Sequence, residues 1–105
     1  MLYMIVTFKG KLGKHYENEK KLEQKYGNQA ELIARRINQL LAAESLYDIS
    51  KLPQAKLHPL SNNRKGQYAV SLLHPKRLIL LPMDGDGTDL KSITSVQILE
   101  IVNYH

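Results

Sequence analysis

The chain has 105 residues and no cysteine, which excludes disulfide bonds and thiolate metal sites. Hydrophobic residues make up 43% and charged residues 24%, a composition typical of globular proteins, and the length predicts one domain that spans residues 1–105. Fifteen Lys and Arg against ten Asp and Glu give a net charge of +5, which favours contact with polyanions. The sequence holds neither an apolar run long enough to span a membrane nor a signal-peptide pattern, so we expect a cytoplasmic protein without a membrane partner.

The N-terminal part predicts a strand followed by a helical hairpin. Residues 3–8 are rich in β-branched and aromatic side chains, which favours an opening strand. Residues 11–26 are highly charged with sparse apolar positions, as in a thinly amphipathic helix. Gly27 is suited to end this helix, and Asn28 followed by Glu31 resembles a capping box that begins a second one.

The second helix has the clearer pattern. Its apolar residues recur at helical spacing on one face, whereas Arg35, Arg36 and Gln39 fall elsewhere. The apolar positions are Ala30, Ile33, Ala34, Ile37, Leu40 and Leu41. Apolar residues at this spacing almost always pack in a core, so we assign them no other role. Residues 45–53 then break the helix.

The C-terminal part predicts a run of strands. Four segments are rich in strand-forming residues and are separated by turn-forming ones, namely residues 55–60, 67–73, 76–81 and 94–102. A strand, two helices and then strands with short connections predict an α+β fold. In this fold the N-terminal strand and the two-helix hairpin pack on a mainly antiparallel sheet.

Two patterns that are often catalytic or metal-binding carry little weight in this sequence. Residues 84–89 read Asp-Gly-Asp-Gly-Thr-Asp, but an EF-hand would need Gly at the sixth loop position and Glu at the twelfth, so we expect a solvated turn and no metal site. The four histidines are dispersed, and we expect His58 to be a packed or surface strand residue rather than a catalyst. Nothing resembles a Ser-His-Asp signature, a P-loop or a dinucleotide-binding glycine pattern.

A basic cluster flanks the hairpin that residues 67–73 and 76–81 are expected to form. Arg64 and Lys65 precede the first strand, and Lys76 and Arg77 begin the second. Four charges along one sheet face suit an RNA strand. A solvated edge that resists aggregation explains them equally well, so the cluster alone leaves both interpretations open.

Several segments, in order along the chain, resemble the HigB "killer protein" branch of the RelE toxins. Four of them are Lys-Leu-His-Pro-Leu at 56–60, Arg-Lys-Gly-Gln-Tyr-Ala-Val at 64–70, His-Pro-Lys-Arg-Leu-Ile at 74–79 and Val-Gln-Ile-Leu-Glu-Ile-Val-Asn-Tyr-His at 96–105. Tyr-Gly at 26–27 and Ala-Ala-Glu-Ser-Leu-Tyr-Asp-Ile at 42–49 also fit. The similarity covers nearly the whole chain.

The resemblance implies a compact, microbial RNase-like fold and a toxin of a type II toxin–antitoxin system. Such a toxin is a ribosome-dependent endoribonuclease that cuts translated messenger RNA without a metal or cofactor. Its partners are the ribosome, messenger RNA and a cognate helix-turn-helix antitoxin of the HigA type, with DNA contacted only through the antitoxin complex. The resemblance also assigns site residues: Lys65, Arg77, Tyr104 and His105 as catalytic, and Arg64, Lys76 and Asn103 as RNA-binding.

RNA cleavage without a metal gives these residue types distinct tasks. A base removes the proton of a ribose 2′-OH, cations stabilise the phosphorane, and an acid protonates the departing 5′ oxygen. The planar guanidinium of Arg77 suits the phosphate, Lys65 suits charge stabilisation or proton removal, and Tyr104 suits stacking on the nucleotide. His105 is a natural acid or base, because an unperturbed histidine has a pKa near neutrality.

One departure from the resemblance keeps a second function open. Asn103 stands where the family has an acidic residue, which removes a carboxylate suited to orient a neighbouring base. The alternative is therefore a catalytically impaired toxin homologue that binds its antitoxin or RNA. A basic DNA-binding domain is less favoured, because the two arginines at 35 and 36 lie in a core-forming helix and no recognition helix is evident.

Overall fold

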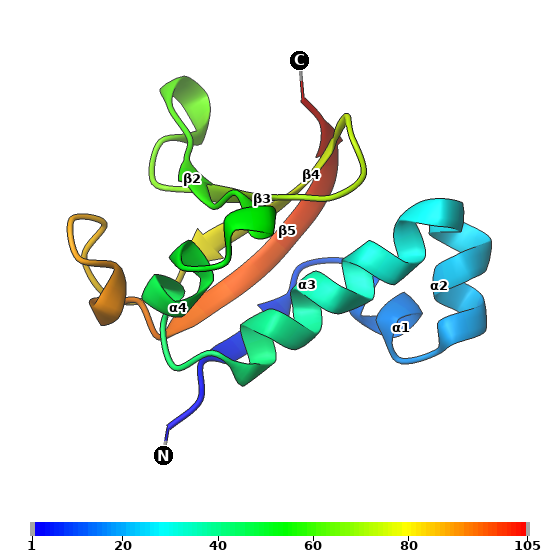
Figure 1. Cartoon of the computed structure of the whole chain (residues 1–105), viewed down its shortest axis with the longest axis horizontal. Helices are drawn as coiled ribbons and strands as arrows, with labels where there is room; N and C mark the ends of the chain where they lie inside the picture. Colours follow the sequence, from blue (N-terminus) through cyan, green and yellow to red (C-terminus); the bar gives the residue numbers. More distant parts are fainter. Residues whose placement is uncertain (1, 105) are drawn as a thin grey trace.

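The structure, a computed structural model, describes residues 2–104 and is an α+β fold, as the sequence predicted (Figure 1). The strands are β1 (Ile5–Phe8), β2 (His58–Pro59), β3 (Tyr68–Ser71), β4 (Lys76–Pro82) and β5 (Ser95–Asn103). They form one sheet in the order β1-β5-β4-β3-β2, in which β1 runs parallel to β5 and the other pairs are antiparallel. The helices are α1 (Leu12–Tyr16), α2 (Glu19–Tyr26), α3 (Ala30–Ala42) and α4 (Leu46–Ser50). Within residues 2–104, no helix has the length and apolarity needed to cross a bilayer.

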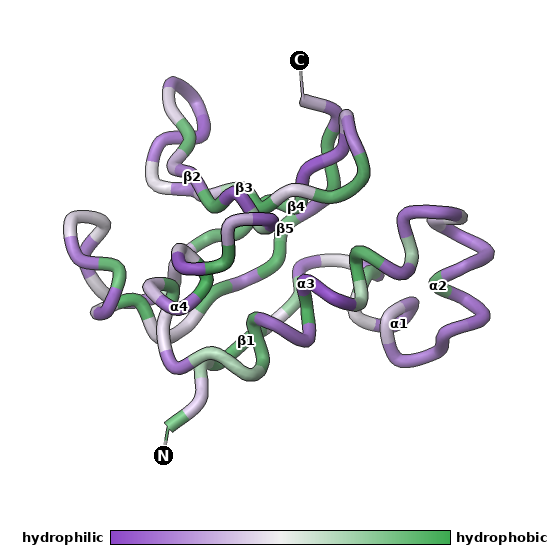
Figure 2. Tube along the Cα trace, in the orientation of Figure 1, coloured by the Kyte–Doolittle hydropathy of each residue, from purple (hydrophilic) through white to green (hydrophobic). Residues whose placement is uncertain are grey.

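The segment from residue 11 to 26 is two helices and not the predicted single one. The side chain of Asn18 accepts hydrogen bonds from the backbone N–H groups of Lys20 at 3.0 Å and Lys21 at 3.3 Å, so it caps α2 and separates it from α1. α2 is hydrophilic over most of its length (Figure 2) and buries only Leu22. The apolar pattern of residues 11–26 was therefore too weak to show where one helix ends and the next begins.

The capping box expected before α3 does not form. A 3₁₀ turn, η1 (Gly27–Gln29), leads directly into α3, and no side chain caps the helix. The Gln29 side chain instead exchanges two hydrogen bonds with the backbone of Leu73, at 2.8 and 2.9 Å. A tertiary contact to the turn between β3 and β4 thus replaces the local cap.

The core lies between α3 and one face of the sheet. From α3 it takes most of the predicted stripe, including Ile33, Ile37 and Leu40, each no more than 1% exposed. From the sheet it takes Val70, Leu78, Leu80, Val96 and Ile98. The predicted set of core residues on α3 was wrong at two positions. It included Leu41, which is 43% exposed, and it left out Arg36, which is 4% exposed.

Arg36 is buried because three groups around it accept its hydrogen bonds. Its Nε donates to the Ser71 carbonyl at 2.8 Å, and its two terminal nitrogens donate to the Gln54 carbonyl at 2.9 Å and to the Gln39 side chain at 3.1 Å. Burial, and to a lesser extent the charge of Arg35, lowers the pKa of Arg36 from its ordinary value. The side chain joins α3 to β3 and to the 3₁₀ turn η2 (Pro53–Ala55).

The strand predicted at residues 55–60 is mostly absent. Ala55 ends η2, Lys56 has a left-handed backbone with φ of 49°, and only His58 and Pro59 pair with β3. The other predicted strands correspond to β1, β3, β4 and β5 with shifted ends. β5 carries an extra residue opposite the Ile79–Leu80 step of β4, which bends the sheet locally.

The Asp-Gly loop after β4 uses its carboxylates to fix its own backbone. Asp84 accepts hydrogen bonds from the Thr94 N–H at 2.8 Å, the Ser95 N–H at 3.0 Å and the Thr94 hydroxyl. Asp86 and Asp89 each accept from a backbone N–H two residues later. Across residues 2–104, no three His, Cys, Asp or Glu side chains gather as a metal site would require.

We expect Asp84→Ala to lower the free energy of unfolding by about 1 kcal/mol at neutral pH, because it removes the acceptor of these bonds. Hydrogen bonds from Thr94 and Ser95, with the Thr94 side chain first, lower the pKa of Asp84 in the folded state. A lowered pKa stabilises the fold above the unfolded pKa of about 4, and this stabilisation is lost as the pH falls through the folded pKa. Urea midpoints of the wild type and the variant should therefore differ at pH 7 and converge near about pH 2. A difference that persists in acid contradicts this role.

Candidate functional site

The sheet face turned away from α3, which we call the open face, carries a row of residues in register. His58 of β2 is opposite Ala69, Ala69 is opposite Ile79, and Ile79 is opposite Glu100 of β5. Residues directly opposite each other on neighbouring strands point to the same face, so these four share the open face. Ala69 and Ile79 are buried and form its floor.

A three-residue cluster occupies one side of this floor. Tyr104 follows β5, and its N–H donates to the Pro75 carbonyl at 2.7 Å. The ring of Tyr104 meets the His58 ring edge-on, with centroids 5.6 Å apart and an interplanar angle of 79°. The guanidinium carbon of Arg77 lies 5.2 Å from the centre of the same ring, within the range of a cation–π contact.

Arg77 has a free donor in this cluster. It lies in β4 opposite Val102, two residues from Ile79, and so on the open face. Its Nε is buried, and none of the residues from 2 to 104 supplies an acceptor for it. Buried donors usually have partners, so the Arg77 guanidinium holds hydrogen-bonding capacity that residues 2–104 do not use.

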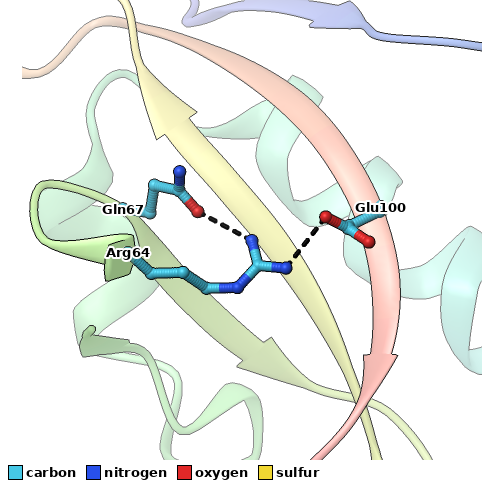
Figure 3. Close-up of polar contacts among 3 residues, drawn as sticks. All are labelled: Arg64, Gln67 and Glu100. Carbon is cyan, nitrogen blue, oxygen red and sulfur yellow. Dashed lines mark hydrogen bonds and ion pairs between the residues drawn. The ribbon is translucent and has the colours of Figure 1, made fainter. Parts of the chain in front are cut away.

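Arg64 reaches the open face from the other side. It ends the 3₁₀ turn η3 (Asn62–Arg64), and its side chain crosses over β4 (Figure 3). One terminal nitrogen donates to the Gln67 side chain at 2.9 Å, and the other contacts the Glu100 carboxylate at 2.9 Å. The floor is thus bordered by the Tyr104 cluster on one side and by this ion pair on the other.

The remaining predicted site residues lie elsewhere. Lys65 lines a cavity of about 450 Å³, together with Pro82 and Gly85, beyond the Tyr68–Leu80 end of the β3–β4 pairing. Arg77 lies at the opposite end of that pairing, so the structure does not bring the two together. Lys76 and Asn103 form a cross-strand pair one residue away from Arg77 and Tyr104, and therefore point to the other face. His105 lies outside the described residues.

His58 is the site residue that sequence reasoning missed. An isolated histidine in a short strand gives no local sign of function, and only the fold brings it to Tyr104, 46 positions later in the chain. The available signal was its place in the Lys-Leu-His-Pro-Leu segment at 56–60, the first part of the HigB resemblance.

The arrangement on the open face suits an RNA nucleotide. A guanidinium binds phosphate through its planar donors, a tyrosine ring stacks on a base, and an imidazole takes up or gives a proton near neutral pH. Arg77, Tyr104 and His58 place one of each within contact of the next.

Comparisons with known proteins find matches among solved structures. No protein-family model and no curated protein matches the sequence. A YoeB/ParE toxin from Agrobacterium tumefaciens matches with a TM-score of 0.53 and 15% identity over 97% of this chain and 99% of that chain. The YoeB–YefM complex from Staphylococcus aureus matches with a TM-score of 0.51 and 20% identity over 97% of both chains, and the YoeB dimer from the same organism with 0.50, 20% and 97% of both. Over nearly its whole length, the chain therefore has the α+β fold of the YoeB toxins.

Proposed function

We propose that the chain is the toxin of a type II toxin–antitoxin system and an endoribonuclease that cuts translated messenger RNA on the ribosome. The observation that carries this proposal is the Tyr104 ring held between His58 and Arg77 on the open face. The YoeB-like fold and the sequence resemblance to the HigB branch of the RelE toxins support the same class. The net charge of +5 suits an RNA substrate.

The proposed reaction is attack of a ribose 2′ oxygen on the adjacent phosphorus. The 2′-OH proton passes to a base, the bond from 2′ oxygen to phosphorus forms, and the bond to the 5′ oxygen breaks as an acid protonates that oxygen. Arg77 binds the phosphate and stabilises the added charge of the phosphorane. Tyr104 stacks on the nucleotide, and His58 and His105 serve as the acid and base pair.

The other basic residues are assigned to binding along the RNA. Lys65 lies at the far end of the β3–β4 pairing from Arg77, so we assign it a contact with the RNA backbone in place of a catalytic role. Arg64 lies on the open face between these two regions of the site. Lys76 and Asn103 point to the other face at the Arg77 end of β4, and we assign them contacts with RNA that extends past this end of the sheet. Such phosphate contacts hold the strand in position while the cluster acts on one nucleotide.

The proposed partner is a helix-turn-helix antitoxin of the HigA type that binds the toxin and through which any DNA is contacted. One of the similar solved structures is a YoeB–YefM complex, which supports a toxin that is bound by a second protein. Co-expression with such a neighbouring protein should abolish growth inhibition.

The proposed function is tested by inducing the chain in bacteria and mapping the 5′ ends of messenger RNA. We expect new ends inside translated coding regions, in frame with the codons, and their loss when translation is blocked. In a purified translation system, a message with a 2′-deoxy nucleotide at the mapped position should stay intact, because it lacks the attacking oxygen. The absence of new ends, with growth unaffected, would favour the impaired homologue that only binds its antitoxin or RNA.

A further inference from the structure

The acidic residue Glu100 is unexpected on the open face, which is proposed to bind RNA. It is the only acidic residue in β3, β4 and β5, and its carboxylate points to the open face that Arg77 and Tyr104 share. A carboxylate repels phosphate, so its presence there calls for a physical reason.

Its contact with Arg64 supplies that reason. The guanidinium of Arg64 lies 2.9 Å from the Glu100 carboxylate, and Gln67 holds the other terminal nitrogen of the same side chain (Figure 3). The pair joins two segments 36 residues apart in the sequence. In the free protein, the guanidinium that faces the RNA site is therefore already occupied by an internal anion.

The pair is easily opened. The Arg64 side chain is 33% exposed and that of Glu100 is 52% exposed, and ion pairs in contact with water contribute little to stability. A phosphate group offers Arg64 charge-assisted hydrogen bonds of the same geometry as the carboxylate. Exchange of one anion for the other leaves no buried charge unpaired.

We propose that Glu100 is an internal competitor of RNA, whose carboxylate occupies Arg64 in the free protein and is replaced there by a phosphate of the bound strand. This inference rests on the proposed function of the open face. Glu100 is then a specificity-determining residue. An anion can bind Arg64 only when its other contacts on the open face offset the loss of the Arg64–Glu100 ion pair. Polyanions that make few other contacts on this face are therefore disfavoured.

The test measures binding of a short single-stranded RNA whose riboses carry 2′-O-methyl groups, so that no cleavage occurs. At low salt, where charge effects are largest, we expect Glu100→Gln to bind this RNA about fivefold more tightly than the wild type. Glu31→Gln is the matched control, because Glu31 forms the other ion pair found within residues 2–104, with Arg35 at 3.3 Å. It removes the same charge far from the site and should change the dissociation constant by less than about twofold.

A double-mutant cycle decides whether the pair opens. If phosphate replaces Glu100 at Arg64, the gain from Glu100→Gln is larger when Arg64 is present than in an Arg64→Gln background, where no pair has to be broken. If the ion pair survives in the complex, Arg64 shields the RNA from the Glu100 carboxylate. The gain in affinity from Glu100→Gln is then larger in the Arg64→Gln background. Far-UV circular dichroism checks that each variant is folded.

Each outcome bears on a different claim. Two results would overturn the proposal that Glu100 competes with RNA while the wild type still binds RNA. One is that Glu100→Gln gains no affinity, and the other is that its gain is equal or larger in the Arg64→Gln background. Both leave the proposed function standing. Failure of all the proteins to bind the RNA overturns the competitor, whereas the proposed function is overturned separately, by the absence of new messenger RNA ends after induction.

Discussion

Replacing Arg36 by alanine is expected to lower the free energy of unfolding by about 3 kcal/mol. The substitution removes the hydrogen bonds from Arg36 to the Ser71 and Gln54 carbonyls, although the Ser71 hydroxyl still donates to the Gln54 carbonyl, and it removes the packing of a side chain that is 4% exposed. The bond to the Ser71 carbonyl is buried, and a buried acceptor that loses its donor costs more than an average hydrogen bond contributes, because it lost water on folding and regains no partner. Urea unfolding followed by circular dichroism measures the loss.

The neighbouring arginine provides a matched control. Arg35 carries the same charge on the same helix, but its side chain is 52% exposed and forms an ion pair with the exposed Glu31. We expect Arg35→Ala to change the free energy of unfolding by less than about 0.5 kcal/mol. Equal losses in the two variants would show that the charge or the helix propensity of arginine matters, and not the contacts of Arg36.

Replacing Arg77 by alanine should reduce ribosome-dependent cleavage of messenger RNA by about 100-fold or more. Arg77 is the guanidinium in contact with Tyr104, and its buried Nε has no acceptor among residues 2–104. Its removal therefore takes away the group proposed to stabilise the phosphorane. Single-turnover cleavage in a purified translation system measures the rate without the complication of product release.

Two further variants separate this effect from net charge. Arg77→Lys keeps the charge but loses the planar pair of donors, so we expect it to recover only a small part of the rate. Arg35→Ala lowers the net charge equally and lies outside the open face, so cleavage should stay within about twofold of the wild type. A similar loss in Arg77→Ala and Arg35→Ala would exclude a specific catalytic role for Arg77.

The strongly patterned elements were predictable because local rules and the fold agree on them. The stripe on α3 follows the helical period, and the apolar segments of β4 and β5 are long enough to read as strands. Predictions failed where the apolar pattern was weak, or where a tertiary hydrogen bond replaced an expected local one. Asn18 divides a weakly apolar segment, and Gln29 bonds to Leu73 where a capping box was expected.

The candidate site was predicted in part for the same reason. Arg77 and Tyr104 lie on β4 and just after β5, two strands that the sequence predicted and that the fold places side by side. Lys65 was expected with them, but the β3–β4 register places it at the other end of the ladder from Arg77. His58 was not expected, because β2 is only two residues long and has little pattern of its own.

The sequence by itself determined the α+β class, the main helical stripe, the long strands and the basic character of the chain, since these depend on residue type and spacing within one segment. The tertiary structure alone decided which charged side chains are buried or paired, and with which partners. Two of the three hydrogen bonds that satisfy the buried Arg36 go to backbone carbonyls distant in the sequence, and Glu100 meets Arg64 only because β5 lies beside β4. Contacts of this kind depend on strand order and register, which bring together residues that no local pattern connects.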